Sequence, residues 1–151
     1  MTVGKLNFTI MYRGYEMAYP LRRYGGGVKN SVLRDHFLNP RGMKRLENPV
    51  GQAIARSETC SDVIRMTVHI DDEGVVTDIG AEVYGCGYSI AGASLFNETA
   101  LGRRVDDVIL KARERLSVII EDVPEQNRRC VELPIKAFTT IYEHYRNTSG
   151  K

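Results

Sequence analysis

The side chains with the most distinctive chemistry in this chain are three cysteines and one aspartate. Cys60 and Asp62 lie two residues apart in "ARSETCSDVI", just before an alternating apolar segment. Cys86 stands between two glycines in "YGCGYS", and Cys130 follows two arginines in "NRRC". A thiol near a carboxylate can be a surface coincidence, half of a redox site, or two ligands of a metal ion. The elements that carry these residues decide between the three interpretations.

Composition and cysteine number limit the class of protein. The chain has 151 residues, 42% of them hydrophobic and 26% charged, as in one ordinary soluble globular domain. No segment has the roughly 18 apolar residues of a membrane helix, and the N-terminus lacks the apolar core of a secretory signal. We therefore expect a cytoplasmic protein. An odd number of cysteines disfavours a disulfide framework there and leaves metal binding, a reactive thiol or simple burial.

The net charge of +2 is unevenly distributed. Residues 1–30 carry five basic groups and one acidic group, and the other 121 residues carry 16 basic and 18 acidic groups. The main part of the chain therefore lacks the basic excess of a nucleic-acid-binding domain. Residues 1–27 hold four of the eight tyrosines and end in Gly25-Gly26-Gly27. We expect them to form an N-terminal arm, loose or packed on a partner, because tyrosines are common contact residues.

From Val28 onward the hydrophobic pattern predicts an α+β domain, which we expect to span residues 28–147 and to end in a short tail at 148–151. "VKNSVLRDHF" has the pattern of a short amphipathic helix that the following Asn-Pro pair ends. Three strands are predicted next, at 50–58, in "DVIRMTVHID" and at 75–83. Short turns make neighbouring strands antiparallel, so we expect a meander with one face in water.

The second half of the chain changes to helical periodicity. Helices are predicted over 88–101, 103–122 and 131–146. Proline is tolerated only in the first turn of a helix, so Pro134 should place Cys130 at or just before the start of the last one. Strands followed by helices predict a small three-stranded antiparallel sheet covered on one face by helices.

In this arrangement each cysteine lies at the end of an element, where side chains from distant segments can gather. Two of the cysteines adjoin helix N-termini, whose free N–H groups and dipole lower the pKa of a thiol and favour the thiolate that binds metal or carries sulfur. Gly85 and Gly87 leave room beside Cys86 for a bulky ligand. The predicted four-ligand set is Cys60, Asp62, Cys86 and Cys130.

Other polar side chains are assigned no direct chemistry. We interpret His36 as structural, place His69 on the polar face of a strand, and put His144 on the last helix. Arg128 and Arg129 are interpreted as a solvated pair that could steady a thiolate.

Several segments, in order, resemble the IscU/NifU-type iron–sulfur cluster assembly scaffolds, including their zinc-binding SufU relatives. "VLRDHFLNPRG" resembles the opening helix of that family, "ETCSDVI" its first ligand motif and "VYGCGYSIAGAS" its second. "NETALGRRVDD" and "RRCVELPIKAF" resemble the segment that follows and the third cysteine with the last helix. The resemblance covers Val28 to Arg146. It implies that Cys60, Asp62, Cys86 and Cys130 are ligands of a cluster or of zinc.

The resemblance implies a scaffold and carrier rather than an enzyme. Such proteins accept persulfide sulfur from a cysteine desulfurase, take iron from a donor, hold a labile [2Fe–2S] cluster and pass it to apo-proteins. Cys130 is our first choice as persulfide acceptor and Cys60 our second. Asp62 offers an oxygen ligand, which is harder than sulfur and would keep the cluster labile. We expect no nucleic acid and no membrane as partner, and a homo-oligomer stays open.

Two alternatives remain at this point. Arg129 stands where IscU-like members carry a histidine, as in the SufU branch, so the chain could be a zinc-dependent sulfurtransferase partner of a desulfurase; yet the spacing from Cys86 to Cys130 lacks the SufU insertion. Alternatively, a bound metal could be purely structural. Ser61 replaces the glycine of the first motif, and "EDVPEQNRR" lacks the Leu-Pro-Pro-Val-Lys chaperone-recognition sequence, which argues against handover through that chaperone.

Overall fold

The computed structural model describes residues 7–12, 15–20, 30–58 and 61–149. Cys60 and the Gly25-Gly26-Gly27 hinge fall outside these ranges, so their predicted roles stay predictions. Among the described residues, no helix combines the length and the apolar character that crossing a membrane requires.

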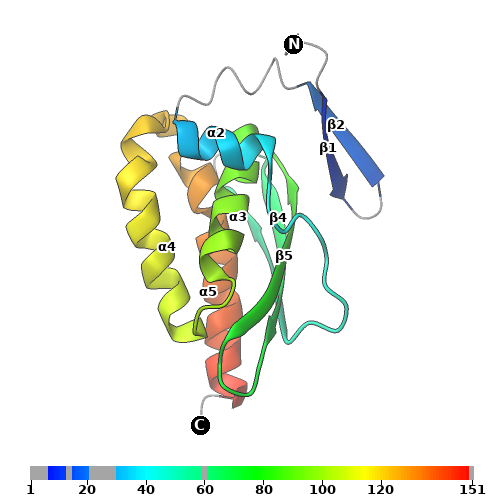
Figure 1. Cartoon of the computed structure of the whole chain (residues 1–151), viewed down its shortest axis with the longest axis vertical. Helices are drawn as coiled ribbons and strands as arrows, with labels where there is room; N and C mark the ends of the chain where they lie inside the picture. Colours follow the sequence, from blue (N-terminus) through cyan, green and yellow to red (C-terminus); the bar gives the residue numbers. More distant parts are fainter. Residues whose placement is uncertain (1–6, 13–14, 21–29, 59–60, 150–151) are drawn as a thin grey trace.

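The centre of the domain is the predicted antiparallel meander. Strands β3 (Gly51–Arg56), β4 (Val63–Ile70) and β5 (Val76–Tyr84) pair in the order β3-β4-β5 (Figure 1). Every second side chain of β4 lies in the core, as the alternation in the sequence predicts. Successive side chains of a strand point to opposite faces, so only one set faces the helices. These buried side chains are Ile64, Met66, Val68 and Ile70.

Helices cover one face of this sheet, as expected. Helices α3 (Gly87–Ala100) and α5 (Arg128–Ser149) pack on the strands. Helix α4 (Val105–Ile119) packs on these two helices (Figure 1). The short helix α2 (Ser31–Leu38) packs on α3. Two single 3₁₀ turns, η3 (Ile120–Asp122) and η4 (Glu125–Asn127), join α4 to α5. The predicted α+β class is confirmed.

Helices α3 and α5 cross at very short range. A Cβ atom on Gly92 would lie 2.7 Å from the Cα and 2.8 Å from the carbonyl oxygen of Val131. Only glycine permits this approach, because any side chain would press on backbone that cannot rotate away. Cys86 precedes α3 and Cys130 lies in the first turn of α5. The crossing therefore fixes the two cysteine-bearing helix starts relative to each other.

The start of the last helix differs from the prediction. Helix α5 begins at Arg128, before Cys130, and Pro134 lies inside it, beyond the first turn. The expectation that Pro134 must be in the first turn is wrong. A proline there removes the N–H that would bond to the Cys130 carbonyl, and burial of the neighbouring Leu133 and Ile135 in the core compensates for that loss.

The second face of the sheet is less wet than predicted. The segment that joins α2 to β3 crosses it and ties itself to the strands. The Leu46 N–H donates to Thr67 Oγ1 over 3.0 Å, and the Arg45 guanidinium pairs with the buried Glu82 carboxylate over 2.6 Å. Periodicity within a strand cannot reveal that a loop covers its polar side, and this is why the expectation of one open face is wrong in part.

The N-terminal arm contains regular structure that the sequence pattern did not predict. Strands β1 (Asn7–Tyr12) and β2 (Tyr15–Pro20) form an antiparallel hairpin, with Asn7 opposite Pro20 and Tyr12 opposite Tyr15. The tyrosines, isoleucine and threonine of this segment favour strands by propensity, but their alternation is too weak to mark two strands.

Candidate functional site

Three of the four predicted ligands converge at one end of the sheet. Asp62 lies just before β4, Cys86 is the N-cap residue of α3, and Cys130 lies in the first turn of α5. One carboxylate oxygen of Asp62 and the two sulfur atoms all lie within 4.8 Å of one another. The convergence predicted for these three residues is confirmed, and Cys60 is not among the described residues.

Asp62 is the hub of the site. Its side chain is only 6% exposed, and its Oδ2 accepts hydrogen bonds from the Cys86 thiol, over 3.3 Å, and from the Ser89 hydroxyl. Burial acts to raise the pKa of Asp62, but hydrogen bonds from Ser89, Cys86 and Cys130 outweigh it and hold the pKa below its ordinary value of 3.8. The carboxylate is therefore ionised at neutral pH, inside the protein, with thiol and hydroxyl donors around it.

The pKa of Cys86 moves in the direction opposite to the prediction. Burial raises the pKa of this thiol above its ordinary value of 9.0, and the negative charge of Asp62 adds to the rise. The hydrogen bond from the Ser89 backbone N–H at the start of α3 acts the other way but is weaker. The expected lowering by the helix N-terminus is wrong for Cys86, because desolvation disfavours a buried thiolate more than the helix favours it.

Cys130 is also more enclosed than a sulfur acceptor was expected to be. Its side chain is 1% exposed and packs in the hydrophobic core. In this conformation Cys130 is buried and Cys86 is partly exposed, and the thiols of both donate hydrogen bonds to the Asp62 carboxylate. Any incoming sulfur or metal must therefore displace these internal hydrogen bonds.

The two glycines beside Cys86 make room for protein groups, not for a ligand. A Cβ on Gly85 would lie 2.6 Å from Cγ of Asp62, and a Cβ on Gly87 would lie 3.2 Å from Cε1 of Phe37. The space predicted for a bulky ligand is filled by the Asp62 carboxylate and the Phe37 ring. Gly85 is required because the hub of the site touches its backbone.

The donor set suits a soft or borderline metal. Two thiolates and one carboxylate oxygen are ligands that zinc and iron–sulfur clusters accept. Zn–S bonds are about 2.3 Å long, so two sulfur ligands of one ion lie at most about 4.6 Å apart. The described donor atoms, within 4.8 Å of one another, are close to that spacing without rearrangement of the backbone. These residues fit a metal or a cluster.

No histidine among the described residues belongs to this donor group. His36 of α2 is buried against α3, where its Nδ1 is hydrogen-bonded to Oγ of Ser94 over 2.7 Å and its Nε2 lies 2.8 Å from Oε2 of Glu98. Burial and the nearby Arg41 guanidinium lower the pKa of His36 below its ordinary value of 6.5, against an opposing effect of Glu98. His36 is a neutral structural side chain, as interpreted from the sequence. His69 bonds to the loop carbonyl of Glu47 over 2.8 Å.

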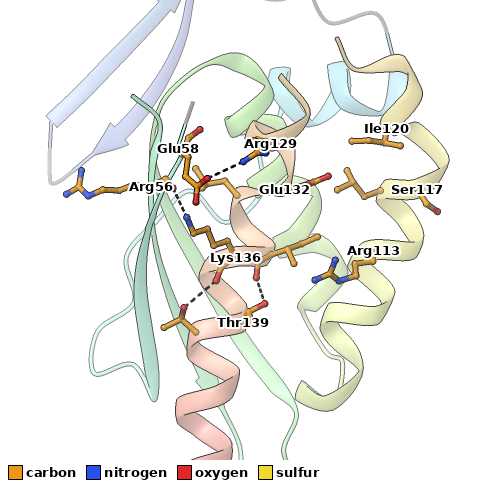
Figure 2. A pocket seen from close by; sticks show the side chains of 14 residues that line it. Arg56, Glu58, Arg113, Ser117, Ile120, Arg129, Glu132, Lys136 and Thr139 are labelled. Atoms are coloured by element: carbon orange, nitrogen blue, oxygen red, sulfur yellow. Dashed lines mark hydrogen bonds and ion pairs between the residues drawn. The ribbon is translucent and has the colours of Figure 1, made fainter. Parts of the chain in front are cut away.

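A groove of about 780 Å³ runs beside the site, between α4, α5 and the end of β3 (Figure 2). Arg129, which precedes Cys130, reaches over it and pairs with Glu58 over 3.2 Å. The ammonium of Lys136 donates to the Arg56 carbonyl over 3.0 Å. Arg129 is exposed, as expected for a solvated side chain, and its ion pair is with Glu58 rather than with a thiolate.

Ser89 is the site residue that sequence reasoning missed. Its position three residues after Cys86 was the available signal, because residues i and i+3 of a helix share a face. The predicted ligand set already brought Asp62 to Cys86, but no motif marked a serine as the hydrogen-bond donor to that carboxylate.

Comparison with known proteins agrees with this architecture. The chain is 27% identical over 135 residues to "Iron sulfur cluster assembly protein 1, mitochondrial" of Debaryomyces hansenii, covering 87% of this chain and 73% of the yeast protein. It is 26% identical over 117 residues to "Iron-sulfur cluster assembly scaffold protein IscU 1" of Archaeoglobus fulgidus, covering 78% of this chain and 76% of the relative.

A solved structure has the same fold. The N-terminal part of a nitrogen-fixing NifU-like protein from Brucella abortus superposes with a TM-score of 0.68 at 18% identity, over 81% of this chain and 96% of that one. The family model for the NifU-like N terminal domain matches residues 28–151, which include all four predicted ligands. The chain belongs to the NifU-like N-terminal domain family.

Proposed function

We propose that this protein is an assembly scaffold and carrier for iron–sulfur clusters, not an enzyme. The observation that carries the proposal is the meeting of the Asp62 oxygen and the sulfur atoms of Cys86 and Cys130 within 4.8 Å. The names of the relatives, which are cluster assembly proteins and scaffolds, agree with it. The cluster is the cargo, a [2Fe–2S] unit built at the site, and Cys60 is the proposed fourth ligand.

The chemistry of the donors explains how such cargo could be both held and released. Cys86 and Cys130 bind iron only as thiolates, so loading releases their protons. Asp62 contributes an oxygen, a harder ligand than sulfur and a weaker partner for this soft cluster. A permanent site would use a fourth thiolate there. We propose that Asp62 keeps the bound cluster transferable.

For sulfur delivery we propose Cys130 as the acceptor, with Cys60 as second choice. The Cys130 thiolate would attack the terminal sulfur of a desulfurase persulfide. The S–S bond of that persulfide breaks, the cysteine of the desulfurase leaves as a thiolate, and Cys130 becomes the persulfide. Because Cys130 is 1% exposed, we expect the start of α5 to open during this step. Normal persulfidation of a Cys130→Ser protein would reject the assignment.

Anaerobic reconstitution with ferrous iron, cysteine, a cysteine desulfurase and a thiol reductant, which supplies the electrons that convert persulfide sulfur to sulfide, tests the scaffold role. We expect a visible [2Fe–2S] spectrum and transfer of the cluster to an apo-ferredoxin. Ser117 lies in the groove and outside the donor set, so Ser117→Ala is a control that should load normally, whereas Cys86→Ser should not. Failure of the wild-type chain to form or transfer a cluster would contradict the proposal.

The same donors support a second candidate, a zinc-dependent sulfurtransferase partner of a desulfurase, because thiolates and a carboxylate also form tetrahedral zinc sites. Stimulation of desulfurase turnover that requires zinc, without cluster transfer, would favour it. Unfolding on chelation with neither activity would indicate a structural metal instead.

Finer features of the proposal follow from the same role. The partners would be a cysteine desulfurase, an iron donor and acceptor apo-proteins, with residues 28–147 as the scaffold domain and residues 1–27 as an arm. A cytoplasmic location remains our prediction, although the yeast relative is named as mitochondrial.

A further inference from the structure

Ser89 contacts two of the predicted ligands and belongs to none of the ligand motifs. It lies in the first turn of α3 and is 1% exposed. Its hydroxyl donates to Oδ2 of Asp62, and its Oγ lies 3.7 Å from Sγ of Cys86. We propose that Ser89 is a positioning residue, which holds the Asp62 carboxylate in place when the site binds metal. This inference rests on the metal-binding role proposed above.

The hydrogen bonds to Asp62 differ in what happens to them when metal binds. In this structure, Asp62 accepts from the thiols of Cys86 and Cys130 and from the hydroxyl of Ser89. The thiols must lose their protons to become ligands, and with them they lose their hydrogen bonds to the carboxylate. Of the three side-chain donors, Ser89 alone keeps its proton in the loaded state.

The loaded site therefore needs this hydroxyl more than the empty one does. Two thiolates and a carboxylate whose donor atoms lie within 4.8 Å repel one another until a cation lies between them. A hydrogen bond from Ser89 to Oδ2, the oxygen that lies 3.3 Å from Sγ of Cys86, opposes rotation of the carboxylate away from the thiolates. Hydrogen bonds to ligating carboxylates typically contribute a factor of about 10–100 to metal affinity.

Cobalt(II) binding to the full chain under anaerobic conditions provides the test. Its visible d–d bands report the number and geometry of ligands, and competition with a chromophoric chelator gives the Kd. We expect Ser89→Ala to weaken binding by about 10–100-fold and to change the d–d bands. The matched control is Ser94→Ala, which removes another buried hydroxyl of α3 that contacts His36 and Arg41 instead. It should lower stability but leave the spectrum and the Kd unchanged.

A double-mutant cycle shows whether Ser89 acts through Asp62. In an Asp62→Ala background, Ser89→Ala should have almost no further effect on the Kd, because the group that it positions is gone. An unchanged Kd and spectrum for Ser89→Ala, an equal loss in the Asp62→Ala background, or an equal loss in Ser94→Ala would each overturn the role of Ser89. If the wild-type chain binds no cobalt, the metal site itself fails, and the proposed function fails with it.

Discussion

Substitution of Gly85 by alanine should damage the site by displacing its hub. The new Cβ would lie 2.6 Å from Cγ of Asp62 and 3.0 Å from its Cβ. Carbon atoms in ordinary contact are about 3.5 Å apart, so the Asp62 side chain would have to withdraw by about 0.9 Å. A shift of this size breaks the hydrogen bonds that Oδ2 accepts from Ser89 and Cys86.

The magnitude follows from those bonds. A buried hydrogen bond to a charged group contributes about 1.5–3 kcal/mol, and replacing glycine by alanine returns about 0.4–1 kcal/mol through the unfolded chain. With two such bonds lost, we expect a net loss of about 2–5 kcal/mol in the free energy of unfolding, which is about 4–20 °C in Tm for a domain of this size. Zinc affinity should fall by about 10–100-fold, because the oxygen ligand is misplaced.

Gly87 on the other side of Cys86 provides the matched control. Alanine there would meet only the edge of the Phe37 ring, at 3.2 Å, and a side chain can move by a few tenths of an ångström. Gly87→Ala should therefore keep zinc affinity near that of the wild type. Thermal unfolding of the metal-free proteins and zinc competition with a chromophoric chelator measure both quantities. Wild-type behaviour of Gly85→Ala in both assays, or an equal loss in Gly87→Ala, would refute the steric reasoning.

Three further outcomes are expected. Asp62→Ala should lengthen the lifetime of the loaded cluster, so an unchanged or faster transfer rate to apo-ferredoxin would count against a role in release. Gly92→Ala should lower the free energy of unfolding, measured in urea, by about 1–3 kcal/mol, because the new Cβ would lie 2.7 Å from the Val131 backbone. An increase of about 1 kcal/mol, as expected at an open helix position, would be inconsistent with the close crossing of α3 and α5. The lowered pKa of His36 means that the unfolded chain binds a proton there more readily than the folded chain does, so the free energy of unfolding should decrease as pH falls below 6.5. Urea unfolding between about pH 5 and 8 measures this slope, which should be smaller in His36→Asn.

The sheet and the helices could be predicted because local periodicity encodes them. Ile64, Met66, Val68 and Ile70 repeat every second residue and lie in the core, as this pattern indicates. The same reasoning placed Asp62, Cys86 and Cys130 at element ends, and the resemblance to a family supplied their shared purpose.

Features that depend on long-range packing could not be predicted. The raised pKa of Cys86 results from burial by distant segments, which a helix-terminus argument does not include. The hydrogen bond of Ser89 requires Asp62, 27 residues away, to face the same turn of helix. The loop over the outer face of the sheet has no period of its own, and the close crossing at Gly92 is visible only once Val131 is in place.

A binding pocket built from distant segments can be filled only when the whole chain is present and folded. Asp62 and Cys86 are 24 residues apart, and Cys130 belongs to the final helix. An incomplete chain has no such pocket, so only finished copies could be filled. A bound metal or cluster present at 100 times its Kd would add about 2.7 kcal/mol to the free energy of unfolding. Each cluster transfer would return the protein to a less stable form that proteases cleave more readily. Proteolysis would then remove mainly the copies that carry no cluster.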